Sequence, residues 1–76
     1  MKQYNGHKSW NYWNVSLWIN NDEGLYNFAR HCVRCSLHKK GAADMMLREL
    51  REQGVTKTPD GARYTLAAIR EAIKEM

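Results

Sequence analysis

Apolar side chains recur at helical spacing in successive segments of the sequence, and this recurrence constrains the fold more than any other feature. Such spacing is typical of a helix with one buried face, whereas a half-buried strand alternates at every second residue. The sequence therefore predicts an all-α chain. The clearest apolar sets are Leu25, Phe28, Ala29, Cys32 and Val33; Ala43, Met46, Leu47 and Leu50; and Leu66, Ala67, Ile69, Ala72, Ile73 and Met76.

The segment 10–19 is predicted to be a further helix, following the good N-cap residue Ser9. It is apolar on two sides of a helical wheel, which is typical of a helix central to its fold. The alternative is a strand, because apolar and polar residues alternate from Trp13 to Ile19. We favour the helix because no later segment resembles a strand that could pair with it.

The residues between these segments predict one domain, residues 1–76, built as a small bundle of about four short helices. Asn20 or Asn21 can cap the second helix, and Gly54 stands where a glycine commonly follows a helix end. Thr58-Pro59 is typical of the start of the last helix. Alternatively, 59–61 forms a turn and the last helix begins after Thr65. Connections of about two to six residues are expected in such bundles.

Seven aromatic residues lie between Tyr4 and Phe28. We interpret them as core, since a short chain needs large side chains to fill its interior. The alternative is a stacking platform for single-stranded nucleic acid. Asn14 projects among these residues, and a buried amide must find partners. We expect its partners to be backbone groups of the same N-terminal segment.

No apolar run approaches the roughly 20 residues that span a membrane. The first residues lack the apolar region of a signal peptide, which predicts a cytoplasmic protein. Two cysteines are too few for a disulfide scaffold, and the cytosol would keep them reduced.

The net charge of +4 is unevenly distributed. Residues 44–76 hold equal numbers of acidic and basic side chains, whereas residues 24–43 hold four cations and no acid. Such a patch favours an acidic partner, although a solvated helix face is the plain alternative. The candidate partner-binding residues are Arg30, His31, Arg34, His38, Lys39 and Lys40.

Four residues with metal-ligating side chains lie within 31–38, namely His31, Cys32, Cys35 and His38. Zinc requires a tetrahedron of ligands, which so short a helical stretch cannot supply alone. We therefore assign no metal and no cofactor to the chain. We interpret Cys32 as a core residue and Cys35 as half-exposed.

The sequence contains no phosphate loop, dinucleotide fingerprint, nucleophile elbow or metalloprotease motif. A core this small also leaves little room for a pocket that excludes water. We therefore expect that the protein is not an enzyme and that its partner is a macromolecule.

Tyr4-Asn5-Gly6, followed by residues 9–18 (SWNYWNVSLW) and 21–26 (NDEGLY), resembles an uncharacterised family of small phage and mobile-element proteins. Its members share a Trp-Asn-Val-x-Leu-Trp core followed by Asn-Asp-Glu. The resemblance covers about the first third of the chain and implies a viral, prophage or plasmid setting. Small proteins of such loci are often inhibitors of host defence, including anti-CRISPR proteins.

The stretches 47–55 and 58–73 are similar to a helix–turn–helix-like element of large serine recombinases. There, a Leu-rich helix ends at glycine, and a Thr-Pro-x-Gly-x-x-Trp-Thr turn leads into a second helix. This chain has Tyr64 where those proteins usually have Trp. The resemblance implies a nucleic-acid-binding module that would present Lys57, Arg63 and Arg70. Against it, this half has no net charge, whereas phosphate binding needs a basic surface.

Two function classes therefore follow from the sequence. The leading one is a small non-enzymatic phage or mobile-element protein that acts in the host cytosol by binding an acidic protein surface, such as that of a defence complex. The alternative is a nucleic-acid-binding helix–turn–helix-like module or small regulator. A homodimer is a third arrangement compatible with the sequence.

Overall fold

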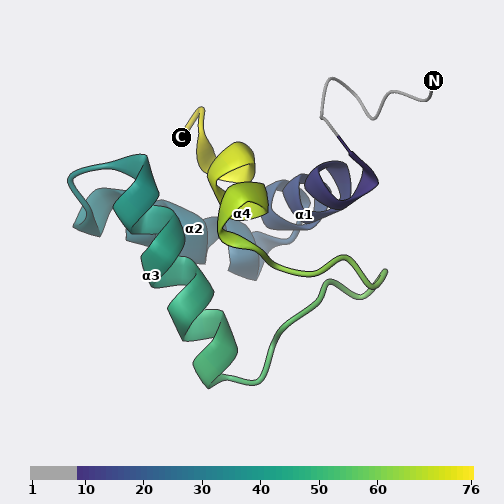
Figure 1. Cartoon of the computed structure of the whole chain (residues 1–76). Helices are drawn as coiled ribbons and strands as arrows, with labels where there is room; N and C mark the ends of the chain where they lie inside the picture. Colours follow the sequence, from purple (N-terminus) through teal and green to yellow (C-terminus); the bar gives the residue numbers. More distant parts are fainter. Residues whose placement is uncertain (1–8) are drawn as a thin grey trace.

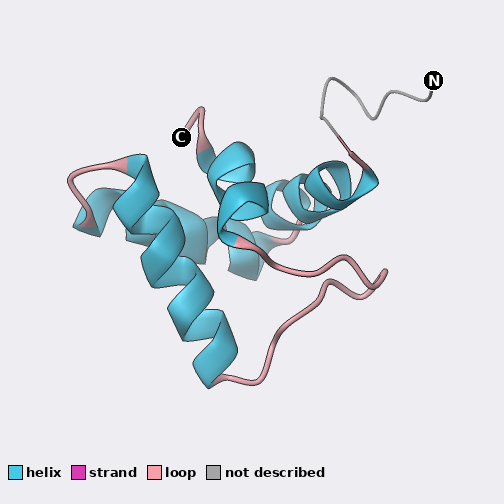
Figure 2. Ribbon diagram, viewed as in Figure 1, coloured by secondary structure: helices cyan, strands magenta, loops and turns pink. Residues whose placement is uncertain are grey.

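Four α-helices follow one another in the order that the apolar spacing predicts (Figure 1). A computed structural model describes residues 9–76, and helices account for most of them (Figure 2). The all-α bundle is therefore confirmed, and residues 10–19 form a helix rather than a strand. The helices are α1 (Trp10–Asn21), α2 (Glu23–Cys35), α3 (Lys39–Glu52) and α4 (Leu66–Ile73).

Side-chain caps fix where three of the helices begin. The Ser9 hydroxyl accepts from the Tyr12 amide, as expected, and the Asp22 carboxylate accepts from the Leu25 amide. The expectation that Asn20 or Asn21 caps α2 is thus wrong. Both asparagine amides instead donate to backbone carbonyls one turn earlier in α1. Thr65 caps α4 by accepting from the Ala68 amide.

A glycine ends α3 in the predicted way. Gly54 has a φ of 77°, a conformation that glycine adopts without steric cost. Its amide donates to the Arg51 carbonyl at 3.0 Å, and the Val55 amide donates to the Leu50 carbonyl at 2.8 Å. These two bonds are those of a Schellman motif, which satisfies carbonyls that the helix end leaves free.

The connection between α3 and α4 is longer than expected and is folded as a hairpin. The Thr58 amide donates to the Ala62 carbonyl at 2.8 Å, and the Gly61 amide donates to the Thr58 carbonyl at 2.9 Å. Lys57 and Arg63 pair as an isolated antiparallel bridge. We call residues 56–64 the hairpin. The alternative with a turn at 59–61 is therefore correct, and Thr58 does not begin a helix.

The core lies where all four helices meet. α1 packs mainly against α4, and α3 packs against both α2 and α4. Val15 and Ile19 of α1 are fully buried, as are Ile69 and Ile73 of α4. The aromatic residues near the N-terminus were expected to fill this core, but the tryptophans lie largely at its edge. Trp10 is 40% exposed, and Trp13 and Trp18 are half-buried. Within residues 9–76, the aromatic residue that is buried is Tyr64, at the end of the hairpin.

Candidate interaction surface

A hydrogen-bonded polar cluster holds the hairpin against α1. The Asn14 side-chain amide donates to Asp60 Oδ2 at 2.9 Å, and the Trp18 indole donates to the same oxygen at 2.9 Å. The Thr58 hydroxyl donates to Asn14 Oδ1 at 2.6 Å and accepts from the Ala62 amide at 3.0 Å. Asn14 is 2% exposed, so these contacts replace the water that burial removes.

These partners of Asn14 differ from the predicted ones. We expected backbone groups of the N-terminal segment, whereas the partners are side chains of the hairpin. Nothing in the local pattern around Asn14 indicates residues so distant in the chain. The charge-stabilising bonds from Asn14 and Trp18 lower the pKa of Asp60. The turn of the hairpin, by contrast, is indicated in the sequence, because Thr58-Pro59-Asp60-Gly61 is typical of a turn.

The six candidate partner-binding residues come from the second half of α2, the α2–α3 turn and the start of α3. Arg30, His31 and Arg34 lie on α2, and His38, Lys39 and Lys40 lie in the α2–α3 turn and the start of α3. Five of the six side chains are exposed, and Lys39 is half-buried. We call this set the basic end surface.

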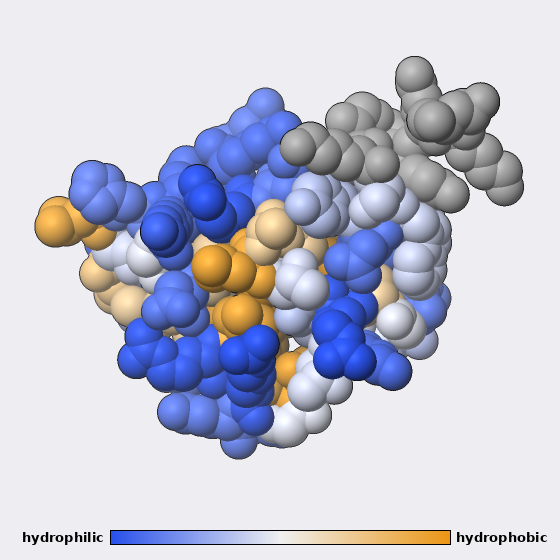
Figure 3. Space-filling model, in the orientation of Figure 1, coloured by the Kyte–Doolittle hydropathy of each residue, from blue (hydrophilic) through white to orange (hydrophobic). Residues whose placement is uncertain are grey.

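The basic end surface has an apolar residue at its tip. Leu37, in the turn between α2 and α3, is 96% exposed. The space-filling view shows a hydrophobic protrusion at this end, bordered by hydrophilic atoms (Figure 3). An exposed leucine alone is ordinary. This leucine stands in the chain between the cations of α2 and those at the start of α3, and it leaves an aliphatic side chain open to solvent there.

The cations of the basic end surface are not neutralised within residues 9–76. In this range the ion pairs join Arg48 to Asp44 and Lys74 to Glu71. The Arg30 guanidinium instead lies 5.8 Å from the centre of the Tyr26 ring and donates to its hydroxyl at 3.3 Å. This contact orients Arg30 without removing its charge.

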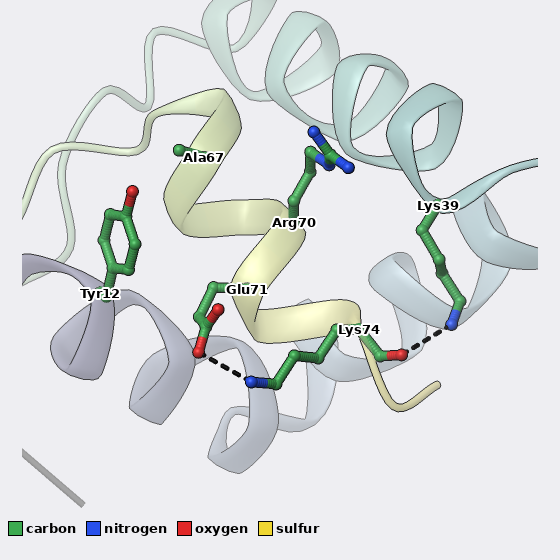
Figure 4. Close-up of a pocket in the computed structure, with 6 residues that line it drawn as sticks. All are labelled: Tyr12, Lys39, Ala67, Arg70, Glu71 and Lys74. Atoms are coloured by element: carbon green, nitrogen blue, oxygen red, sulfur yellow. Dashed lines mark hydrogen bonds and ion pairs between the residues drawn. The ribbon is translucent and has the colours of Figure 1, made fainter. Parts of the chain in front are cut away.

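A shallow depression of about 320 Å³ adjoins this surface on the outer side of α4. Ala67, Arg70, Glu71 and Lys74 present one face of α4 here, between Tyr12 of α1 and Lys39 of α3 (Figure 4). The Lys39 ammonium donates to the Lys74 carbonyl at 3.0 Å, and the Lys74 ammonium pairs with Glu71 at 2.9 Å. We call this depression the α4 trough.

The residues of the nucleic-acid alternative do not form one surface of their own. Lys57 and Arg63 face each other across the hairpin, which also carries Asp60. Arg70 lies in the α4 trough beside Lys39, a member of the basic end surface. The structure thus brings one member of this set, Arg70, to the same depression as Lys39, whereas Lys57 and Arg63 stay on the hairpin.

The two cysteines of α2 lie on different sides of the helix, one buried and one exposed. Cys32 is fully buried, and burial raises the pKa of its thiol, with a smaller contribution from Cys35. Cys35 is exposed, more so than expected, and its sulfur lies 3.6 Å from His31 Nε2. Within residues 9–76, no three His, Cys, Asp or Glu side chains are placed to hold a metal ion.

Comparison with known proteins gives a family for the chain. The profile of a family of unknown function, DUF7249, matches residues 1–76. The chain belongs to DUF7249. Comparisons with curated proteins and with solved structures found no match. Family membership therefore brings no activity with it, and a functional assignment for this DUF7249 protein depends on its own residues.

One further observation concerns membranes. Among residues 9–76, no helix is long and apolar enough to cross a bilayer. Residues 4–8 of the phage-protein motif lie outside the described residues.

Proposed function

We propose that this protein acts by binding another protein through the basic end surface and performs no chemistry of its own. The single observation that carries the proposal is the 96% exposure of Leu37 among cations that have no acidic partner within residues 9–76. Partners bury such an apolar anchor at the centre of an interface and place charged residues around its rim. The partner that fits is an acidic protein surface with an apolar pocket for Leu37.

The positive charge of the basic end surface supports binding to an acidic partner in two ways. It raises the rate of association with that partner, and it repels basic proteins that would compete. A nucleic acid would use the same charges, but it gains nothing from an aliphatic side chain at the tip. Leu37 has no ring on which a base could stack. This residue therefore favours a protein partner.

The proposed biological role is that of a phage or mobile-element accessory protein in the host cytosol. The motif Trp13-Asn14-Val15-Ser16-Leu17-Trp18 supports this setting through its resemblance to small phage proteins. Within that setting, we propose that the partner is a host defence complex of the CRISPR type. The basic end surface would occupy an acidic face of that complex and block its action.

Affinity purification tests the binding proposal. Tagged wild-type protein, an Arg30→Glu/Arg34→Glu variant and a Leu37→Asp variant would be used as baits in the cell that carries the gene. The control is Arg51→Glu/Arg63→Glu, which changes the net charge equally at exposed sites outside the basic end surface. We expect one specific protein with wild type and control, and its loss with the other two baits.

Two results would contradict the proposal. One is recovery of the same protein at equal yield by Arg30→Glu/Arg34→Glu. The other is recovery of nothing specific by wild type. For the biological role, phage plaques would be counted on a CRISPR-immune strain that expresses the protein. Immunity that remains complete would remove the defence-inhibitor role and leave the binding proposal standing.

A further inference from the structure

We infer that the α4 trough continues the interface and takes an acidic polypeptide segment of the same partner. This inference rests on the proposed function and adds a second contact region to it. The combined binding surface would take residues from α2, α3 and α4, with Tyr12 of α1 at its border.

Lys39 makes the two regions continuous. It belongs to the basic end surface, and it also lines the trough. Its ammonium donates to the Lys74 carbonyl at 3.0 Å, which ties the start of α3 to the end of α4 (Figure 4). Lys39 and Leu37 are two residues apart in the chain, so a partner that contacts Leu37 could reach the trough through Lys39.

The charge of the trough matches an acidic segment. Lys39, Arg70 and Lys74 face one carboxylate, that of Glu71. The Lys74 ammonium is engaged by Glu71, whereas Arg70 is exposed and has no ion pair within residues 9–76. In the close-up, the Arg70 guanidinium extends toward α3, away from Glu71 (Figure 4). A guanidinium in this setting can bind a carboxylate with two parallel hydrogen bonds.

The same trough fits a polypeptide better than a nucleic-acid backbone. A phosphodiester backbone is uniformly negative and carries no hydrogen-bond donor, whereas the trough mixes three cations with the Glu71 carboxylate. A polypeptide supplies backbone N–H groups as well as acidic side chains. Tyr12, the aromatic residue of the trough, is half-buried and packs against the core. Its ring is therefore not presented as a platform for a base.

Ala67 shapes the trough. It is exposed, and its methyl group leaves room between Tyr12 and Arg70 along the face of α4. A larger residue at this position would fill the floor without altering any charge. A substitution at Ala67 therefore distinguishes binding within the trough from general attraction to a positive surface.

The test uses isotope-labelled protein titrated with a short synthetic peptide that is rich in Glu and Asp and contains one Leu. Amide chemical shifts would be followed across residues 9–76, with oligo-dT as a competing probe. We expect shift changes at residues 67–74 as well as at residues 30–40. Arg70→Glu should weaken peptide binding about tenfold, because a favourable charge contact becomes repulsive. Ala67→Leu should weaken binding without a change of charge.

Arg51→Glu is the matched control, and it should change the affinity by less than about threefold, as expected for a charge outside the interface. Circular dichroism would establish that each variant keeps its helices. Shift changes confined to residues 30–40 would overturn the trough and leave the proposed function standing. Absence of any shift change would contradict both the inference about the trough and the proposed function. Displacement of the peptide from residues 67–74 by equimolar oligo-dT would assign the trough to nucleic acid instead.

Discussion

The side chain of Asn14 donates a hydrogen bond to Asp60 at 2.9 Å and so joins two residues that are 46 positions apart in the chain. Through this contact a helix near one end of the chain holds the hairpin that precedes the last helix. The contact is part of a cluster in which Thr58 and Trp18 also take part. The cluster stabilises the hairpin, which is otherwise built from turns.

Replacing Asn14 by alanine should destabilise the fold by about 1–3 kcal/mol, because the buried Thr58 hydroxyl is left without its acceptor. The Thr58 hydroxyl and the Asp60 carboxylate would each lose a partner. Urea denaturation at neutral pH would measure the loss. Asn27→Ala, at an exposed position of α2, should change stability by less than about 0.5 kcal/mol. Equal effects of the two substitutions would show that the cluster contributes nothing.

Stability should fall in acid partly through Asp60. Hydrogen bonds from Asn14 and Trp18 hold the pKa of Asp60 below its ordinary value of 3.8. The ionised form is thus favoured by folding, and its contribution is present above the unfolded pKa and is lost as pH falls through the folded pKa. Urea denaturation of wild type and Asp60→Asn, at neutral pH and in acid, would reveal it. The variant should lose less stability on acidification than wild type; an identical loss would contradict this cause.

Two glycine-to-alanine substitutions should change the stability of the fold in opposite directions. Gly61 has a φ of 96° in the turn of the hairpin, so Gly61→Ala should destabilise by about 1 kcal/mol or more. Gly41 lies in α3, and an added methyl group would meet Ser36 Cβ at an ordinary 3.8 Å. Gly41→Ala should therefore stabilise by about 0.5–1 kcal/mol. Thermal denaturation of both variants measures the signs, and a stable Gly61→Ala protein would rule out the positive φ.

The two cysteines should differ in reactivity. Cys35 is exposed, whereas Cys32 is buried and its pKa is raised by that burial. Iodoacetamide should modify Cys35 in the folded protein and modify Cys32 only after denaturation, as mass spectrometry of peptides would show. Rapid modification of both sites without denaturant would mean that α2 opens readily from the core.

A pair of aliphatic truncations separates stability from binding. Ile73 is fully buried, so Ile73→Ala should cost about 2–5 kcal/mol, a large fraction of the stability of so small a domain. Leu37 is 96% exposed, so Leu37→Ala should leave the melting temperature almost unchanged. If Leu37→Ala also lowered the melting temperature, the residue would have a structural role and its value as a binding anchor would be lost.

The sequence predicted the helices because their signals are local. The spacing of Leu25, Phe28, Ala29 and Cys32 identifies a buried face without reference to the rest of the chain. The end of α3 was predictable for the same reason, since Gly54 acts within its own turn. Contacts between residues far apart in the chain were harder to predict. The partners of Asn14 depend on how the hairpin packs, and no local pattern encodes that packing.

The candidate site remains a prediction in its function, but the structure adds to its description. The excess of cations in 24–43 is visible in the sequence, and five of the six candidate side chains are exposed. Their union with Arg70 and Lys74 depends on the contact of α3 with α4, which the sequence does not specify. The exposed position of Leu37 depends on the turn between α2 and α3, which the sequence does not specify.

The packing of α1 against α4 has a consequence for synthesis on the ribosome. α1 finds its main partner only after residues 66–73 have been translated. Until then, Val15 and Ile19 have no α4 to cover them and stay exposed to other nascent chains and chaperones. Folding should therefore occur late and nearly all at once, which makes premature termination before α4 far more harmful than its loss of eight helical residues suggests.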